Sequence, residues 1–327
     1  MLETTPPSPV SLSALGDQPR LSEPRHARRA RFHQSWYRAV QLGVPGWGKT
    51  PMGRPLGSIL PVAAAAAGRN FTSPEAKAMF VKRRTLGWGV DPVRMTSHMT
   101  SSQALLMNLF GPLADDQGWL LEVLRGVLTR PDLTEVLDVA VEFAPPKRSQ
   151  YLGDMTRVDV FMKLAAEGGI EGLVLELKYT DRFSSRRLPL SESPRYCDLA
   201  ESTHLWKSPD HTFTDGSVSQ LVRCHALGAR TLQVDLGATL PATLLLVHHP
   251  LDLGAGPVFD AYRRQLANPK LATRVDLERF LQTALAWAPG IEQARGIREL
   301  QLRYLRQEES EALWHEHLAA THPTKRR

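Results

Sequence analysis

Two alternating runs that flank a Gly-Gly pair constrain the fold of this chain more than any other feature. Residues 156–164 and 172–179 alternate between apolar and other side chains, which is the spacing of a half-buried β-strand. The pair at 168–169 is a favoured two-residue hairpin turn. With those glycines as the turn, the numbers of paired residues sum to 337. Asp159 is then predicted to lie opposite Lys178.

The same register predicts a cluster of charge on one face of the hairpin. Phe161 lies opposite Glu176, so Asp159, Glu176 and Lys178 share a face, and the other face is apolar and suited to pack against helices. A three-residue turn would break this parity, so the inference depends on the turn length.

Two carboxylates this close repel each other, and a divalent cation removes that conflict. Oxygen ligands suit Mg²⁺ or Mn²⁺. Lys178 can then orient or help to deprotonate an attacking water, or neutralise charge on a phosphate. The alternative is a cross-strand ion pair between Asp159 and Lys178, with Glu176 in solvent. We favour the metal site, because the flanking residues of both strands are apolar.

The elements around the hairpin follow from the same periodicities. Residues 100–129 have helical spacing with an interruption at Gly111-Pro112, and residues 136–143 alternate as a further strand. A helix is predicted at 217–227 and a short buried strand at 242–247. The predicted order is therefore helix, three strands of one antiparallel sheet, helix and strand.

The two ends of the chain have different compositions. Residues 1–24 contain five prolines and few large apolar residues, which predicts a disordered leader. Residues 25–41 hold five arginines around an apolar stripe, which predicts a basic amphipathic helix. The predicted division is a leader at 1–24, a basic helical region at 25–99, a core at 100–250 and C-terminal helices at 251–327 that pack on the core.

The net charge of +6 is unevenly distributed. Residues 1–100 carry 14 Lys and Arg against 5 Asp and Glu, whereas residues 101–327 carry 26 against 29. The basic excess favours a polyanion partner, nucleic acid before membrane, although a solvated basic tail explains it equally well. The longest aliphatic stretch, at 244–247, is too short to span a membrane, and two cysteines form no disulfide framework. A cytoplasmic protein is expected.

A glycine-rich segment formally matches a nucleotide-binding motif. Residues 43–50 read G-x-x-x-x-G-K-T, but that mechanism needs a strand before the loop and a helix after it. An arginine-rich helical pattern precedes the segment here, and prolines follow it. We therefore set nucleotide binding aside.

The charged hairpin resembles a known signature. Asp159, sixteen intervening residues and then Glu176-Leu177-Lys178 resemble the motif of the PD-(D/E)XK nuclease superfamily, whose common core has the element order given above. Four further blocks are similar to a family of bacterial restriction-endonuclease-like proteins within it, at residues 31–36, 68–71, 101–105 and 108–113. The resemblance implies an α/β fold with a restriction-endonuclease-like core and helical additions at both ends.

The resemblance implies a site as well as a fold. Asp159 and Glu176 match the metal-binding carboxylates, with Mg²⁺ or Mn²⁺ as the cofactor, and Lys178 matches the catalytic lysine that positions the attacking water. The carbonyl of Leu177 is expected to help to hold the metal. Val158 stands where many members have proline. The implied activity is hydrolysis of DNA phosphodiesters, and a homodimer is compatible with it.

The remaining members of the site stay open at this point. Glu122, Gln103 and Glu142 are rival candidates for a further acidic or polar group. Gln220 lies on the helix after the E-x-K strand, with Arg223 one turn on, where both could reach a phosphate.

Arginines outside the core motif are the expected DNA contacts. Three lie on the first helix and three in a long loop at 180–209, which Trp206 is expected to anchor. They are Arg28, Arg29, Arg31, Arg182, Arg186 and Arg187. In this interpretation, truncating residues 1–41 weakens DNA binding more than it disturbs the core. The rival interpretation is a non-catalytic nucleic-acid-binding or scaffold module on a nuclease-like fold.

Overall fold

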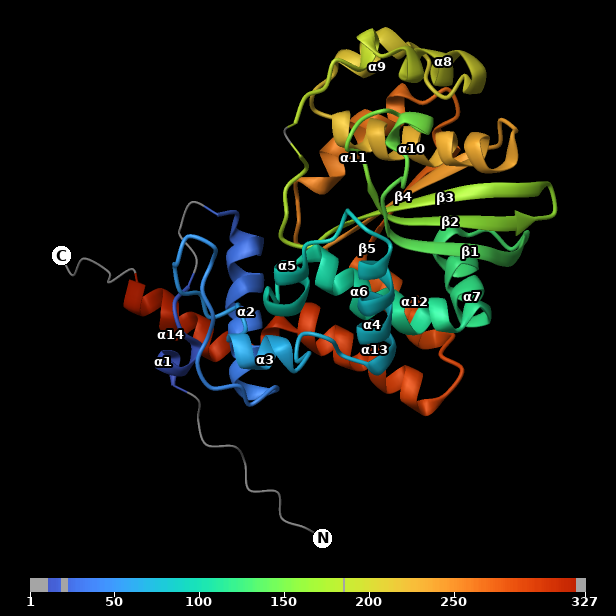
Figure 1. Ribbon diagram of the computed structural model, residues 1–327. Helices are drawn as coiled ribbons and strands as arrows, with labels where there is room; N and C mark the ends of the chain where they lie inside the picture. The colour runs from blue at the N-terminus through green and yellow to red at the C-terminus, as the bar shows by residue number, and fades with distance from the viewer. Residues whose placement is uncertain (1–10, 19–22, 185, 322–327) are drawn as a thin grey trace.

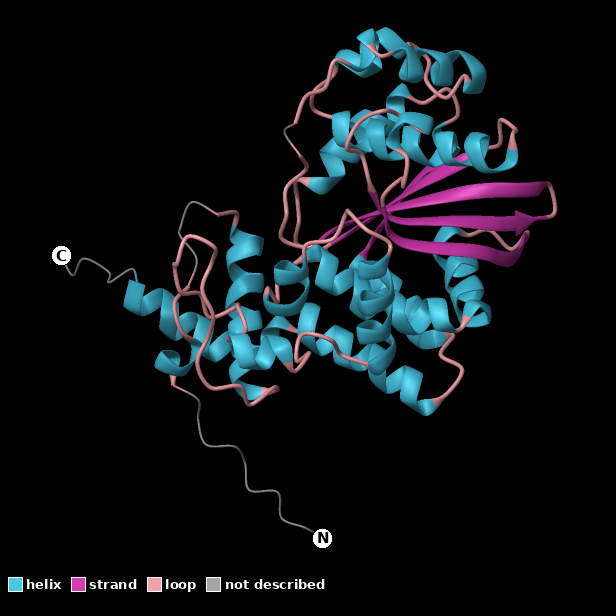
Figure 2. Cartoon of the chain, in the orientation of Figure 1, coloured by secondary structure: helices cyan, strands magenta, loops and turns pink. Residues whose placement is uncertain are grey.

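A five-stranded sheet lies between two layers of helices (Figures 1 and 2). The computed structural model describes residues 11–18, 23–184 and 186–321. The strands lie in the order β1-β2-β3-β4-β5. Their bounds are β1 Leu133–Phe143, β2 Val158–Ala166, β3 Gly169–Lys178, β4 Ala242–His248 and β5 Ala272–Asp276.

The sheet changes direction at its centre. β1, β2 and β3 form an antiparallel meander, whereas β4 runs parallel to β3 and β5 runs parallel to β4. The predicted order of helix, three strands, helix and strand is confirmed by α7, the meander, α10 and β4. β5 is an addition from the C-terminal segment, where only helices were predicted.

One face of the sheet packs on the lower helical layer in Figure 1. Val160, Met162, Leu175 and Leu177 point into this core. Its helices are α6 Ser102–Asp115, α7 Gln117–Leu128, α12 Leu277–Ala286 and α13 Ile291–Tyr304. The predicted break at Gly111-Pro112 is wrong, because α6 continues through Pro112 and ends at Asp115. The carboxylate of the next residue, Asp116, caps α7.

The other face carries Phe161 and Val174 and is covered by α10. The long connection after β3 is not a bare loop, because it contains a short 3₁₀ turn and α8, and Trp206 is buried as expected. The upper layer consists of α8 Pro194–Thr203, α9 Pro209–Thr214, α10 Ser219–Leu236 and α11 Ala255–Gln265. Four 3₁₀ turns are η1 Arg148–Gln150, η2 Leu190–Glu192, η3 Pro269–Leu271 and η4 Gln307–Ser310.

The hairpin register differs from the predicted one by two residues. Ala166 pairs with Gly169 and Val160 pairs with Leu175, so the paired numbers sum to 335. Gly169 has a φ of 115° and belongs to β3, which leaves residues 167–168 as the turn. Asp159 therefore lies opposite Glu176, not Lys178. A slip of two residues does not change the face on which a side chain lies. Asp159, Glu176 and Lys178 therefore still share one face, as predicted.

The two ends of the chain pack together beside the sheet. Phe32 and Trp36 of α2 share a core with Trp314 of α14, and α2 also packs against α13 and η4. Helices in this part are α1 Leu12–Leu15, α2 Arg25–Val40, α3 Val62–Ala66, α4 Pro74–Thr85, α5 Pro92–Ser97 and α14 Glu311–Thr321. Residues 25–99 and 251–321 thus interlock.

Part of the expected leader is folded. Residues 1–10 and 19–22 lie outside the described residues, but α1 lies within the leader and its Leu15 is buried against α2. Arg38 of α2 is fully buried and donates to the carbonyls of Gly57 at 2.8 Å and Ala14 at 2.7 Å, and to those of Val44 and Gly46. The glycine-rich segment at 43–50 therefore turns its carbonyls toward an arginine, not its amides toward a phosphate.

Candidate active site

Three carboxylates occupy one row across the meander. β1 pairs Val141 with Val160 and Phe143 with Val158, so Glu142 lies opposite Asp159. The β2–β3 register places Glu176 on the other side of Asp159. Glu142 is 2% exposed and Glu176 is 4% exposed. Adjacent strands are about 4.8 Å apart, so three acidic groups approach each other in a region with little solvent.

Lys178 and Gln220 contact the third carboxylate of this row. The ammonium of Lys178 lies 2.7 Å from Glu176 Oε1 and donates to Gln220 Oε1 at 3.2 Å. The amide of Gln220 donates to Glu176 Oε1 at 2.6 Å, and its Oε1 also accepts from the Ser184 backbone N–H. The alternative of an Asp159–Lys178 pair with a solvated Glu176 is wrong, because Glu176 is buried and is itself the partner of Lys178.

Glu142 adopts an unusual backbone conformation. Its φ is 50°, in the left-handed region that non-glycine residues rarely adopt. The buried guanidinium of Arg83 donates to the Glu142 carbonyl at 2.8 Å, and Gln103 Nε2 donates to Glu142 Oε2 at 2.6 Å. The other carboxylate oxygen, Oε1, is buried and has no hydrogen-bond partner among the described residues. Strain of this kind is concentrated at functional sites.

Burial and mutual repulsion shift the titration of this cluster. Burial raises the pKa of Glu142 to about 7, the charge of Glu176 adds to that rise, and the Gln103 hydrogen bond opposes it. Burial, Glu176 and Glu142 together raise the pKa of Asp159 well above its ordinary value. Burial alone would lower the pKa of Lys178, but the charges of Glu176 and Asp159 outweigh it and the pKa rises. The lysine is therefore held as an ammonium ion.

Cationic side chains line the cleft around the carboxylates. The cleft has a volume of about 350 Å³ and contains Arg182 and Arg186 of the loop after β3 together with Arg223 of α10. Arg223 is buried, with an exposed fraction of 7%, and its Nε has no hydrogen-bond partner among the described residues. A buried guanidinium N–H without a partner is costly, and a phosphate oxygen would satisfy it.

The structure brings most of the predicted site residues together. The cleft is lined by Gln103, Glu142, Asp159, Glu176, Lys178, Arg182, Arg186, Gln220 and Arg223. Glu122 does not line it and instead pairs with Arg125 at 2.6 Å on α7. Arg187 does not line it either, although it is exposed.

The arginines of α2 differ from the expectation. Arg29 is buried and donates to Ser310 Oγ at 2.8 Å and Glu311 Oε2 at 2.9 Å, so its guanidinium is already bonded within the fold, and a DNA contact by Arg29 stays a prediction. Arg31 donates to Glu23 and Thr100, and Arg28 is partly buried. Much of the N-terminal basic excess therefore stabilises the fold, which the net charge could not reveal.

Among the lining residues that were not predicted from the sequence, three are polar or cationic side chains with bonds across the cleft wall. Arg157 lies two positions before Asp159, so strand parity would have placed it on the same face, and it donates to Gly89 O at 2.7 Å. Thr156 accepts from Arg223 Nη1 at 3.4 Å. Arg94 reaches the cleft from α5 and pairs with Asp181 at 3.2 Å, and no local pattern indicates this.

The comparison with protein families agrees with this geometry. Residues 21–306 match the model of the PD-(D/E)XK nuclease superfamily, which is most of the chain. The chain belongs to this superfamily. A search of curated proteins and of solved structures finds no match. Members of the PD-(D/E)XK superfamily are generally nucleases that hydrolyse nucleic acid and typically use divalent metals.

The donor set of this PD-(D/E)XK site fits a hard divalent cation. Glu176 is a buried carboxylate and Asp159 a half-buried one, the two repel each other, and Glu142 Oε1 is a further buried oxygen without a partner among the described residues. Within the described ranges, no three His, Cys, Asp or Glu side chains are already arranged as a metal cluster. Mg²⁺ is compatible with this, because it commonly binds one or two carboxylates and completes its shell with water and phosphate.

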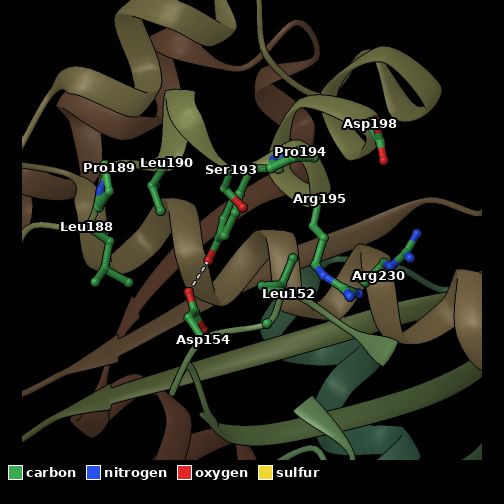
Figure 3. Close-up of a pocket in the computed structure, with 12 residues that line it drawn as sticks. Leu152, Asp154, Leu188, Pro189, Leu190, Ser193, Pro194, Arg195, Asp198 and Arg230 are labelled. Atoms are coloured by element: carbon green, nitrogen blue, oxygen red, sulfur yellow. Dashed lines mark hydrogen bonds between the residues drawn. The ribbon is translucent and has the colours of Figure 1, made fainter. Parts of the chain in front are cut away.

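A second hollow lies apart from the carboxylates, between the start of α8 and the middle of α10 (Figure 3). It has a volume of about 670 Å³ and is lined by Arg195, Arg230 and Asp198 among others. Tyr196 donates to Asp154 at 2.8 Å beside it, which is the dashed line of Figure 3. It shares no lining residue with the cleft of the nuclease motif.

None of the helices in the described ranges is both long and apolar enough to cross a membrane.

Proposed function

We propose that this protein is a metal-dependent nuclease that hydrolyses DNA phosphodiester bonds. Asp159 and Glu176 would hold Mg²⁺ or Mn²⁺ with the Leu177 carbonyl, and Lys178 would position the attacking water. Glu142, the nearest further acid, would complete the acidic row, and Gln103 would orient it. Glu122 is not part of this proposal.

The observation that carries the proposal is the row of three acids, two buried and one half-buried, with an ammonium beside it. Glu142, Asp159 and Glu176 stand at matching positions of three adjacent strands, and Lys178 is 6% exposed. A fold has no need for three carboxylates so close together, two of them buried, because burying charge costs several kcal/mol per ion. A cation and a phosphodiester would offset that cost.

The side chains around the metal site would have different roles in the reaction. When bound, a divalent cation acts as a Lewis acid on the phosphodiester and offsets the carboxylate charge. Lys178, held as an ammonium by its acidic neighbours, would donate to the attacking water and stabilise charge on the phosphoryl oxygens. Gln220 would keep the lysine and Glu176 in position, because it bonds both of them.

The arginines of the cleft would hold the substrate backbone. Arg223, with its unpartnered Nε, and Arg157 would bind phosphate next to the reacting bond. Arg182 and Arg186 would hold the neighbouring phosphates, with Arg187 further along the same loop. Arg28 and Arg31 would contribute at the outer edge. Phosphate contacts add affinity without sequence information, so binding should weaken steeply with salt.

The test is cleavage of plasmid and linear DNA by the full-length protein, with Mg²⁺ or Mn²⁺ and with EDTA. We expect metal-dependent cleavage that is lost in Asp159→Ala and Lys178→Ala and retained in Glu122→Gln, whose carboxylate lies outside the cleft. Circular dichroism and thermal unfolding of each variant show that the fold is intact. Cleavage that persists in both site variants would refute the assigned roles.

A non-catalytic nucleic-acid-binding or scaffold module is the second candidate. It is favoured by one observation, namely that the described side chains do not form a ready three-ligand metal cluster. This candidate predicts salt-sensitive DNA binding that survives both substitutions, with no cleavage of any DNA under either metal. The same assay therefore separates the two candidates.

A further inference from the structure

A larger cavity adjoins the cleft of the three acids. It has a volume of about 1010 Å³ and lies between the start of α2, the loop after β3, the loop before α11 and the η4–α14 segment. Asp181 and Arg182 line both spaces, so the cavity adjoins the cleft. Phe183 lines the cavity, and the Lys178 ammonium lies 5.1 Å from the centre of its ring.

The lining of this cavity suits a base better than a phosphate. Phe183, Val258 and Trp314 supply apolar and aromatic surface. Its acids are largely neutralised, because Asp181 pairs with Arg94, Glu311 with Arg29 and Glu308 with Arg306. Arg25 and Arg182 have no ion-pair partner in the described part of the chain. Mixed polar groups around aromatic faces are what a flipped nucleobase requires.

Two exposed leucines stand at the rim of the cavity. Leu251 is 53% exposed and Leu253 is 86% exposed, on the short loop between β4 and α11. The loop is held in place, since Leu251 N donates to the buried His249 ring at 3.1 Å and Gly254 N donates to Asp252 at 2.9 Å. Apolar side chains presented beside a nucleic-acid site can insert between base steps and unstack them.

We propose that this cavity receives a nucleotide turned out of the substrate duplex, while Leu251 and Leu253 fill the space that it leaves. The inference rests on the proposed nuclease function and deepens it, because it assigns the substrate a distorted or unpaired nucleotide next to the cut. The position of Arg182 between the two spaces supports a nucleotide over a peptide, since the same arginine can hold the phosphate that connects the extruded base to the cleaved strand. The volume exceeds the ~300–1,000 Å³ typical of small-molecule pockets, so a whole nucleotide fits.

Two consequences follow for the substrate. A mismatched or unpaired base has already lost much of the pairing energy that extrusion costs, so a duplex that contains one should bind about tenfold tighter than a fully paired duplex. The Leu251→Ala/Leu253→Ala variant should bind the paired duplex about tenfold more weakly, because it loses two apolar contacts that form only in the complex.

The experiment uses the full-length protein in EDTA, so that DNA is bound but not cut, with short duplexes that carry 2-aminopurine at one position. A fluorescein label on the same duplex reports binding by anisotropy, and 2-aminopurine fluorescence rises when the base leaves the stack. We expect binding with a rise in fluorescence at one or two positions, and loss of that rise in the leucine variant. The matched control is Leu236→Ala/Ile291→Ala, which removes two exposed apolar side chains (40% and 83% exposed) that do not line the cavity.

The outcomes separate this inference from the proposed function. Binding with no fluorescence change at any position overturns the inference, leaves the nuclease proposal standing and points to an apolar peptide as the occupant of the cavity. An equal loss in the control pair also overturns it, because the effect would then be general. Absence of binding to any duplex, in EDTA and in Mg²⁺ with Asp159→Ala, overturns both.

Discussion

Replacing Glu142 by glutamine should stabilise the metal-free protein at high pH. Burial raises the pKa of Glu142 from 4.5 to about 7. The unfolded chain therefore releases this proton near pH 4.5 while the native state keeps it up to about pH 7, so the native state loses stability across that window. The difference of about 2.5 in pKa, at about 1.36 kcal/mol each, corresponds to about 3 kcal/mol.

The assay is urea unfolding in EDTA from pH 4.5 to 8, with the free energy of unfolding compared between variant and wild type. The gain of Glu142→Gln should grow with rising pH to about 3 kcal/mol, or about 4 °C in Tm for a chain of 327 residues. Taking the difference removes contributions that both proteins share, such as those of the histidines. Glu122→Gln, on the surface pair with Arg125, is the control and should show no such trend.

The effect of added Mg²⁺ on stability tests the same prediction in a second way. Saturating Mg²⁺ should stabilise the wild type at pH 8 by offsetting the carboxylate charge, and should stabilise Glu142→Gln less. A variant whose stability relative to wild type is independent of pH would refute the reasoning, since the acid would then not be buried among like charges.

Three further predictions concern the rest of the molecule. Truncation of residues 1–41 should abolish cooperative unfolding by urea, because α2 supplies part of a buried core, contrary to the separate-arm expectation from the sequence. The urea midpoint of unfolding should fall as the pH drops from 6.5 toward 4. Burial lowers the pKa of three histidines to about 4 in the native state, so the unfolded chain takes up protons first. They are His33, His225 and His249. Gln220→Ala should lower the cleavage rate about tenfold or more with an unchanged circular dichroism spectrum, because the substitution removes the side chain that holds Lys178. The control is Gln233→Ala on the same helix, which should have no effect because Gln233 contacts only surface groups.

The alternation of the strands carried most of the fold prediction. Period-two patterns identified the meander, and strand parity placed Asp159, Glu176 and Lys178 on one face despite a register error of two residues. An error of two residues leaves each side chain on its predicted face, but it changes which residue lies opposite on the neighbouring strand. The exact partner of Asp159 depended on which glycine begins β3, and a Gly-Gly pair leaves that choice open.

The features that the sequence did not reveal depend on distant contacts. β5 has only five residues, with Ala272 buried in one core and Val275 in the other, so no alternation distinguishes it from a loop before a helix. Glu142 can be assigned to the acidic row only once the β1–β2 register is known. The alternation of β1 by itself does not say which residue of β2 lies opposite Glu142. Arg29 and Arg38 are indistinguishable in sequence from surface arginines, and their burial is decided by Ser310 and by carbonyls of the segment at 43–57.

The interlock of the two ends has a consequence for synthesis. His33 of α2 bonds Ser310, and Gln34 bonds both Arg303 and Tyr179, which follows Lys178 directly in sequence. Ser310 and Arg303 leave the ribosome some 270 residues after their partners in α2, which at about 5–20 residues per second is a delay of about 14 to 54 s. During that interval His33 lacks Ser310, Gln34 lacks the Arg303 carbonyl, and Tyr179 at the end of β3 lacks its ring contact with Tyr304. Tyr179, next to Lys178, is therefore fully packed only after residues 303–310 have been synthesised.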